Sequence, residues 1–239
     1  MLKVSEKFGI PYTAIPCFNY DRIKQPPFVF NEWDRHRSKK NNKTVVSSNW
    51  LVEQVLENQF ELAFHGYNHE SLVDSIWPGP EYMEGALVAA RKKWRINRFG
   101  SFPKTYVPPS NEVDSIGLVH FANAMPEVEF MSSLYDGDLA EGGDREFDID
   151  PFEPRLFDFP RISSGYTYND FKIYNQESLY LFTGIWTHFV HPDDIYQLPS
   201  QPNNSAGDYA FRNAQGLNWY SSEDGRKGMF ETWNDYLQH

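Results

Sequence analysis

Hydrophobic and polar positions along the middle of the chain alternate between the helical period and short apolar runs. A helix is predicted at 47–59, where apolar residues at helical spacing follow a Ser or Asn cap. The run "FELAFHG" at 60–66 has the length and composition of a buried strand. The same order then repeats, with a helix at 81–98 that carries Met83, Leu87, Ala90 and Trp94 on one stripe, a strand at 105–107, a helix at 112–125 and a strand at 128–134.

The flanking segments have weaker patterns. The first residues predict the end of a helix, a Gly-Ile-Pro break at 9–11 and a strand at 12–18. Residues 19–43 and 136–154 have no apolar period and are predicted to be loop insertions, the second of them an acidic surface excursion. Two further strands are predicted at 155–164 and 178–192, and a final helix at 229–237.

Repeated strand and helix units predict an α/β fold with a parallel sheet, either open or closed into a barrel. We expect one domain over 1–239, since α/β domains of this length are common as single units. In both forms of the sheet, ligands bind at the carboxyl ends of the strands.

Composition and charge exclude some classes of binding partner. The net charge is -11, which argues against a nucleic-acid partner, because phosphate binding depends on clustered Lys and Arg. The one basic run, "RHRSKKNNK" at 35–43, is expected to be a solvated loop. Cys17 is the sole cysteine, so no disulfide forms within the chain. No apolar run reaches the ~20 residues that a membrane-spanning helix needs. Aromatic residues make up 17% of the chain and supply either a packed core or flat surfaces for sugar rings.

Four of the seven histidines fall at two predicted strand ends. His65 and His69 follow the strand that ends at Phe64, and His188 and His191 lie near the end of the strand at 178–192. Three intervening residues let two imidazoles converge on one metal ion, and Gly66 allows a sharp turn between them. The alternative is two ordinary polar residues in a loop, because a catalytic metal site also needs a third ligand, usually a carboxylate.

Several segments together resemble the polysaccharide deacetylases of the NodB-homology family. "FELAFHGYNHE" is similar to the family's His-x-x-x-His metal motif, and "LKVSEKFGIPYTAIPCF" is similar to its first helix and second strand. "VPPSN" stands where the family has an Arg-x-Pro-Tyr type segment, and "FVHPDD" resembles its "HPWE" type ending. The similarity is strongest to the divergent deacetylase-like domains of bacterial surface proteins. It implies a distorted (β/α) barrel, incomplete here, and a location outside the cell or at its surface.

The resemblance also implies a mechanism and a set of site residues. A divalent metal, with zinc favoured over cobalt or nickel, would be held by His65 and His69 and would activate water for hydrolysis of N-acetyl or O-acetyl groups on a polysaccharide. His191 would act as general acid, oriented by Asp193 or Asp194. His188 lies on the opposite face of the strand and is expected to pack against a helix. Substrate contacts are expected from Tyr67, Pro109, Asn111, Arg161 and Trp186, with a structural salt bridge as the alternative role of Arg161.

The sequence also departs from the family pattern. In the family, paired aspartates at the end of the first strand supply a metal ligand and the base, and the printed sequence does not include this strand. We expect the first strand and these residues to lie upstream in a larger polypeptide. Asp21, Asp193 and Asp194 are the acids that could substitute by position. Tyr106 and Val107 replace the family's Arg. Two other functions therefore stay open: a catalytically inactive glycan-binding domain, and a glycoside hydrolase, for which no carboxylate pair stands out.

Overall fold

The structure is a computed structural model, and it describes residues 2–30, 36–40, 43–47, 49–165, 170–191, 197–198, 211–212 and 229–238. Its contacts divide the chain into two compact units. The larger unit is Tyr12–Pro160, and the smaller unit combines Met1–Pro11 with Arg161–His239. The single domain expected over 1–239 stays a prediction, because two such units can belong to one domain.

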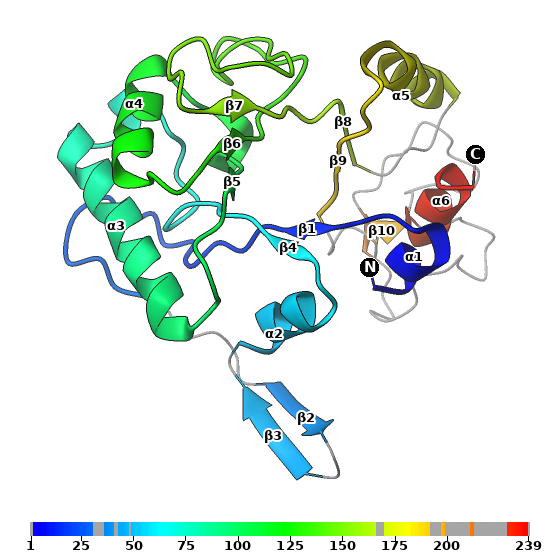
Figure 1. Ribbon diagram of the computed structural model, residues 1–239, viewed down its shortest axis with the longest axis horizontal. Coiled ribbons are helices and arrows are strands. Elements are labelled where there is room, and N and C mark those ends of the chain that lie inside the picture. Colours follow the sequence, from blue (N-terminus) through cyan, green and yellow to red (C-terminus); the bar gives the residue numbers. More distant parts are fainter. Residues whose placement is uncertain are drawn as a thin grey trace. The chain divides into compact units, whose positions relative to one another are not determined.

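The helices and strands of the larger unit alternate in the order that the sequence predicts, as Figure 1 shows. Its elements are β1 (Thr13–Ala14), β2 (His36–Lys40), β3 (Lys43–Ser47), α2 (Trp50–Glu57), β4 (Glu61–Leu62), the 3-10 turn η1 (Asp74–Ile76), α3 (Pro80–Asn97), β5 (Thr105–Tyr106), the 3-10 turn η2 (Pro109–Asn111), α4 (Ser115–Ala124), β6 (Phe130–Met131) and β7 (Phe157–Asp158).

The smaller unit contains α1 (Leu2–Phe8), β8 (Ser163–Ser164), α5 (Asp170–Thr183), β9 (His188–Phe189), β10 (Gln197–Leu198), β11 (Phe211–Arg212) and α6 (Met229–Tyr236). Strands β8 and β9 pair in parallel, whereas β10 and β11 are antiparallel. Across the described part of the chain, the helices lack the combination of length and apolar character that crossing a bilayer requires.

Backbone hydrogen bonds join the parallel strands of the larger unit in the order β1, β4, β5, β6, β7. Strand β1 pairs with β4, and β5, β6 and β7 form a three-stranded sheet. Phe64 connects the two groups, because its N–H donates to Thr105 and its carbonyl accepts from Val107. The α/β fold class is thus confirmed. A closed barrel is absent among the described strands.

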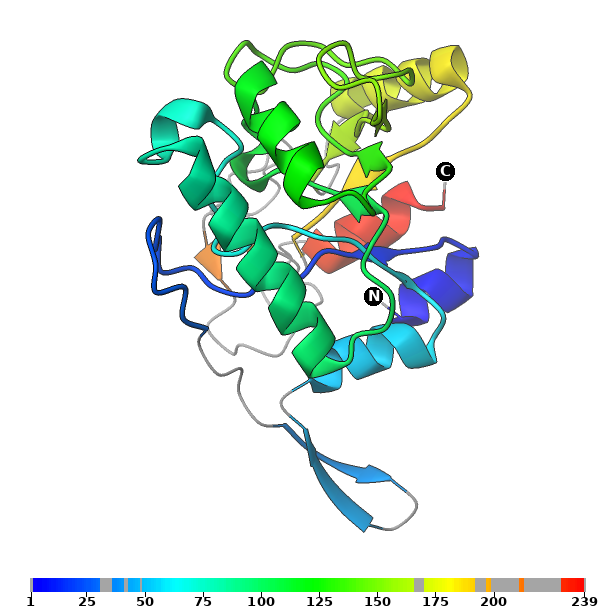
Figure 2. The ribbon, with the colours of Figure 1, turned by 60° about the vertical axis from the view of Figure 1, so that its left-hand side comes forward.

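Helices α3 and α4 lie side by side against this sheet, as Figures 1 and 2 both show. The predicted stripe of α3 is confirmed, because Met83, Leu87, Ala90 and Trp94 are all fully or almost fully buried. Full burial of a Met or Leu side chain contributes about 1.5–3 kcal/mol. The core between these helices and the sheet therefore holds the strand ends in place.

The predicted strand at 178–192 is wrong for its first half. Residues 178–183 belong to α5, and only His188–Phe189 form a strand, β9. Gln176 is buried and Leu179 and Thr183 are partly buried, which is helical spacing, whereas the intervening Leu181 and Phe182 are exposed. A short apolar run does not distinguish helix from strand, and here the apolar side chains on the outer face of the helix suggested the wrong period.

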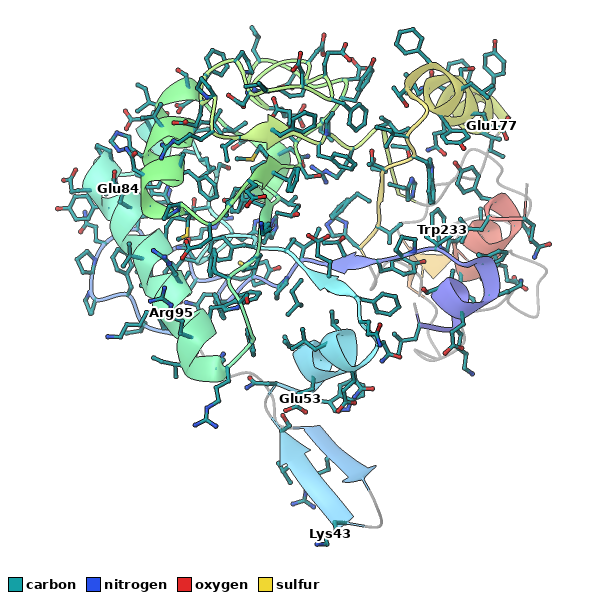
Figure 3. The ribbon with its side chains drawn as sticks, in the orientation of Figure 1. Lys43, Glu53, Glu84, Arg95, Glu177 and Trp233 are labelled. Carbon is teal, nitrogen blue, oxygen red and sulfur yellow. The ribbon has the colours of Figure 1, made fainter. Side chains whose placement is uncertain are left out.

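The basic run at 35–43 is also more ordered than predicted. Its described residues pair with the following segment as an antiparallel hairpin of β2 and β3, at the end of the 19–43 insertion. The Ser47 hydroxyl at the base of the hairpin donates to Glu53 on α2 (2.8 Å). Figure 3 labels Glu53.

The acidic insertion at 136–154 lacks helices and strands, as predicted, but it is not only a surface excursion. Arg145 is buried and its Nη1 donates to Asp150 (2.7 Å) and to Asp158 at the end of β7 (3.1 Å). Asp150 also accepts the N–H groups of Phe152 and Glu153. Breaking one partner of such a buried network leaves an uncompensated charge, so the network fixes the insertion to the sheet.

Burial and the neighbouring Asp150 raise the pKa of Asp158 from 3.8 to about 7, with Arg145 opposing them. A carboxyl whose pKa is raised by folding binds its proton more tightly in the native state. Its contribution to stability is therefore complete below about pH 4 and is lost as the pH rises towards 7, at up to about 1.4 kcal/mol per pH unit.

We expect Asp158→Asn to remove this loss, because an amide stays neutral. Chemical denaturation at pH 4, 5, 6 and 7 should show the free energy of unfolding of the variant rising relative to the wild type across this range. Asp136→Asn, at an exposed position of the same insertion, is the control and should track the wild type. A difference between variant and wild type that does not change with pH would contradict the prediction.

Candidate metal centre

The carboxyl ends of β4 and β5 meet at His65. The residue follows Phe64 directly, and its Nδ1 lies 2.7 Å from the carbonyl oxygen of Val107, the residue after β5. A carbonyl oxygen only accepts, so Nδ1 carries the proton and Nε2 carries the lone pair of the neutral ring. A backbone carbonyl holding one nitrogen in this way is the usual arrangement of a histidine that ligates a metal through the other.

The turn from His65 to His69 brings the two imidazoles together. Gly66 has a φ of +85° and His69 a φ of +56°, both in the left-handed region. The ring centroids are 4.9 Å apart and the rings are nearly perpendicular, at 76°. Two imidazoles bound at about 2.0–2.1 Å to one tetrahedral ion would have centroids about 5 Å apart. Both side chains are partly exposed, and the distance between their centroids matches that of two ligands of one metal ion.

A second loop runs alongside this turn. The segment 19–24, which follows β1, contacts the segment 67–70 at four points. The contacts are Asn19 N–H to the Tyr67 carbonyl (3.0 Å), the Tyr20 ring on the His69 ring (5.2 Å, 25°), Asn68 Nδ2 to the Ile23 carbonyl, and Lys24 to Glu70 (3.3 Å). The imidazole of His69 is therefore held between Tyr20 and His65.

Neutral groups lie beneath the turn. Burial raises the pKa of the Cys17 thiol to about 11, and the thiol donates to the Asn19 carbonyl (3.2 Å). Burial also raises the pKa of Tyr106 well above its usual value. Its hydroxyl has no hydrogen-bond partner among the described residues, and it lies 3.6 Å from where a side chain at Gly66 would begin. Both groups stay protonated at neutral pH.

The described residues supply two donors rather than a complete ligand set. Within the described ranges, no group of three or more His, Cys, Asp and Glu side chains is arranged to hold a metal ion. Asp21 lies on the loop beside the turn, exposed, with Oδ1 accepting from the N–H of Ile23 (3.3 Å). Asp193 and Asp194 lie outside the described residues.

Three residues predicted to contact substrate lie in or beside this turn, and two of them are buried in the structure. Tyr67 is buried, and its hydroxyl donates to the Val29 carbonyl. Pro109 is buried against Gly66. Asn111 is partly exposed, with a φ of +62°. Of the three, Asn111 alone presents a partly exposed side chain at the strand ends.

In the smaller unit, His188 is a packed residue, as expected. Its ring stacks on Trp186 and on Trp233 of α6, which Figure 3 labels, with centroids 5.4 and 4.6 Å away. Nε2 donates to the Gly165 carbonyl (2.6 Å), so Nδ1 accepts from the Ser163 hydroxyl (2.7 Å). Burial lowers the pKa of His188 to about 4, which keeps the ring neutral.

The smaller unit also contains His191, Arg161 and Trp186. The ring of Phe189 lies between the first two, 4.7 Å from the His191 ring and 4.7 Å from the Arg161 guanidinium. His191 is exposed, whereas Arg161 is buried. Trp186 stacks on His188 and belongs to the aromatic cluster of α6.

A family model described as "Uncharacterised protein conserved in bacteria (DUF2194)" matches residues 1–217. The chain belongs to the DUF2194 family. No curated protein matches it. A crystal structure described as a "putative polysaccharide deacetylase from Mycobacterium smegmatis" is similar to the DUF2194 chain with a TM-score of 0.46 and 16% identity, over 79% of this chain and 60% of that one. The DUF2194 chain thus spans less than two thirds of that protein. The relation to the NodB-homology deacetylases stays a resemblance.

Two features of the DUF2194 chain went unrecognised in the sequence. Tyr20 is the second residue after the predicted strand at 12–18, and the rule that ligands bind at strand ends could have selected it. Asp158 ends β7, and the same rule applies to it. The partner Arg145 gives no local signal, because it lies in a loop without a period.

We expect His65 and His188 of the DUF2194 chain, the rings of which each donate to a backbone carbonyl, to be opposite tautomers. Long-range ¹H–¹⁵N NMR at pH 8 should show His65 protonated at Nδ1 and His188 at Nε2, because each of these nitrogens donates to a backbone carbonyl. Histidine-to-alanine variants would assign the signals. Finding His65 protonated at Nε2 would remove the nitrogen lone pair that a metal needs in this arrangement.

Proposed function

We propose that this protein is a metal-dependent hydrolase that removes acetyl groups from a polysaccharide. The observation that carries the proposal is the pair of converging imidazoles at the carboxyl ends of two parallel strands. His65 is held by a backbone carbonyl through Nδ1, and His69 lies 4.9 Å from it between centroids. In a parallel α/β sheet this edge is where ligands bind.

His65 and His69 would hold a divalent cation, and zinc suits the imidazole ligands best, with cobalt or nickel as alternatives. The bound ion would supply Lewis-acid polarisation of the acyl carbonyl and a water of lowered pKa. A carboxylate would complete the site, with Asp21 as the described acid on the adjoining loop. The protonated ring of His191 would pass its proton to the departing amine, or to the sugar oxygen of an ester.

A second function is supported by one observation, the two-donor set among the described residues. A domain with this fold could bind a glycan without hydrolysing it. Metal content separates the two, because the enzyme requires a bound ion and simple stacking on aromatic rings does not.

The metal ligands are tested first. We expect His65→Ala and His69→Ala each to weaken Zn²⁺ binding by more than about 100-fold, since loss of a direct ligand exceeds the 10–100-fold effect of losing an outer-shell partner. Titration calorimetry of the full-length protein, backed by elemental analysis, measures this. His120→Ala is the matched control, because His120 bonds Glu84 on the outer helices (2.7 Å). Unchanged metal affinity in both site variants would refute the metal centre.

The general acid gives a separate test. His191→Ala should lower the rate of acetate release from an N-acetylglucosamine oligomer by about 10²–10⁴-fold, the usual contribution of a positioned acid, while leaving metal affinity unchanged. His188→Gln, at the packed neighbour, should affect the free energy of unfolding instead. Full activity in His191→Ala would assign the proton transfer to another group.

A further inference from the structure

Tyr20 combines high exposure with a fixed position. Its side chain is 72% exposed, yet its ring stacks on His69 with centroids 5.2 Å apart and an interplanar angle of 25°. One face of the ring is thus occupied by the imidazole. With 72% of its surface exposed, Tyr20 is accessible to solvent beside the histidine pair.

The backbone on both sides of Tyr20 is anchored. Asn19 is almost fully buried, its N–H donates to Tyr67 and its Nδ2 donates to the Val29 carbonyl (2.8 Å). On the other side Arg22 adopts a φ of +57°, and the Ile23 carbonyl accepts from Asn68. Because the backbone around Tyr20 is already fixed in the free protein, less conformational entropy is lost when a ligand binds there.

We propose that Tyr20 is a saccharide-stacking residue, which holds a pyranose ring of the substrate beside His65 and His69. The inference rests on the proposed function for the identity of the ligand. An exposed aromatic face is apolar, and the axial C–H groups of a pyranose form a flat apolar surface that matches it.

The competing role for Tyr20 is support of His69 alone, as a positioning residue. The two roles differ in what they change. Loss of a stacking surface weakens saccharide binding and leaves the metal affinity intact, whereas loss of support for a ligand weakens metal binding first.

The experiment compares Tyr20→Ala, Tyr20→Phe and wild type in the full-length protein. Binding of tetra-N-acetylchitotetraose and of an N-acetylgalactosamine oligomer is measured by titration calorimetry, together with Zn²⁺ affinity and, where acetate is released, kcat and KM. Tyr174→Ala is the matched control, because Tyr174 on α5 is 71% exposed.

We expect Tyr20→Ala to weaken binding of the saccharide about tenfold, with a matching rise in KM and a smaller change in Zn²⁺ affinity. Tyr20→Phe should keep most of the affinity, and Tyr174→Ala all of it. Equal saccharide affinity in Tyr20→Ala, a loss confined to Zn²⁺ affinity, or a wild type that binds neither oligomer would each overturn the inference.

The outcomes separate this inference from the proposed function. Saccharide binding that depends on Tyr20, without bound metal or acetate release, would sustain the stacking residue and reject the hydrolase. Metal-dependent acetate release with an unchanged KM in Tyr20→Ala would sustain the hydrolase and reject the stacking residue.

Discussion

The parallel register between Phe64 and Tyr106 is the constraint on which the site depends. The N–H of Phe64 donates to Thr105 and its carbonyl accepts from Val107, which joins β4 to β5 at their carboxyl ends. This register sets the Val107 carbonyl 2.7 Å from Nδ1 of His65. A shift by one residue would turn the alternate side chains to the other face and remove the bond. The tautomer of His65, and so the direction of its lone pair, follows from strand pairing.

The histidine turn is conformationally costly and is held by its surroundings. A non-glycine residue in the left-handed region costs about 1–2 kcal/mol, and His69 adopts it. The contacts between 19–24 and 67–70, with buried Asn19 and Tyr67 among them, offset this cost. Strain of this kind persists where the surrounding structure fixes it, and it is typical of functional sites. The same contacts that hold the turn also place Tyr20 against His69.

A buried charge network holds another loop in place at β7, the last strand in the order β5, β6, β7. Arg145 and Asp150 come from an insertion of strongly acidic composition, and Asp158 comes from the end of β7. The raised pKa of Asp158 shows that one arginine does not fully offset two buried carboxylates. The insertion is thus held to the sheet by an arrangement whose stability depends on protonation.

The sequence alone determined the elements whose side chains repeat with one clear period. The stripe from Met83 to Trp94 predicted α3, and the short apolar run before His65 predicted β4, because burial of these side chains requires such patterns. It failed at 178–183, where apolar side chains on the outer face of α5 concealed the helical period. Only the tertiary structure decided that Val107 bonds His65, that Tyr20 stacks on His69 and that Arg145 meets Asp158. These contacts join residues far apart in sequence or in segments without a period, and local pattern carries no information about which backbone or loop will lie opposite.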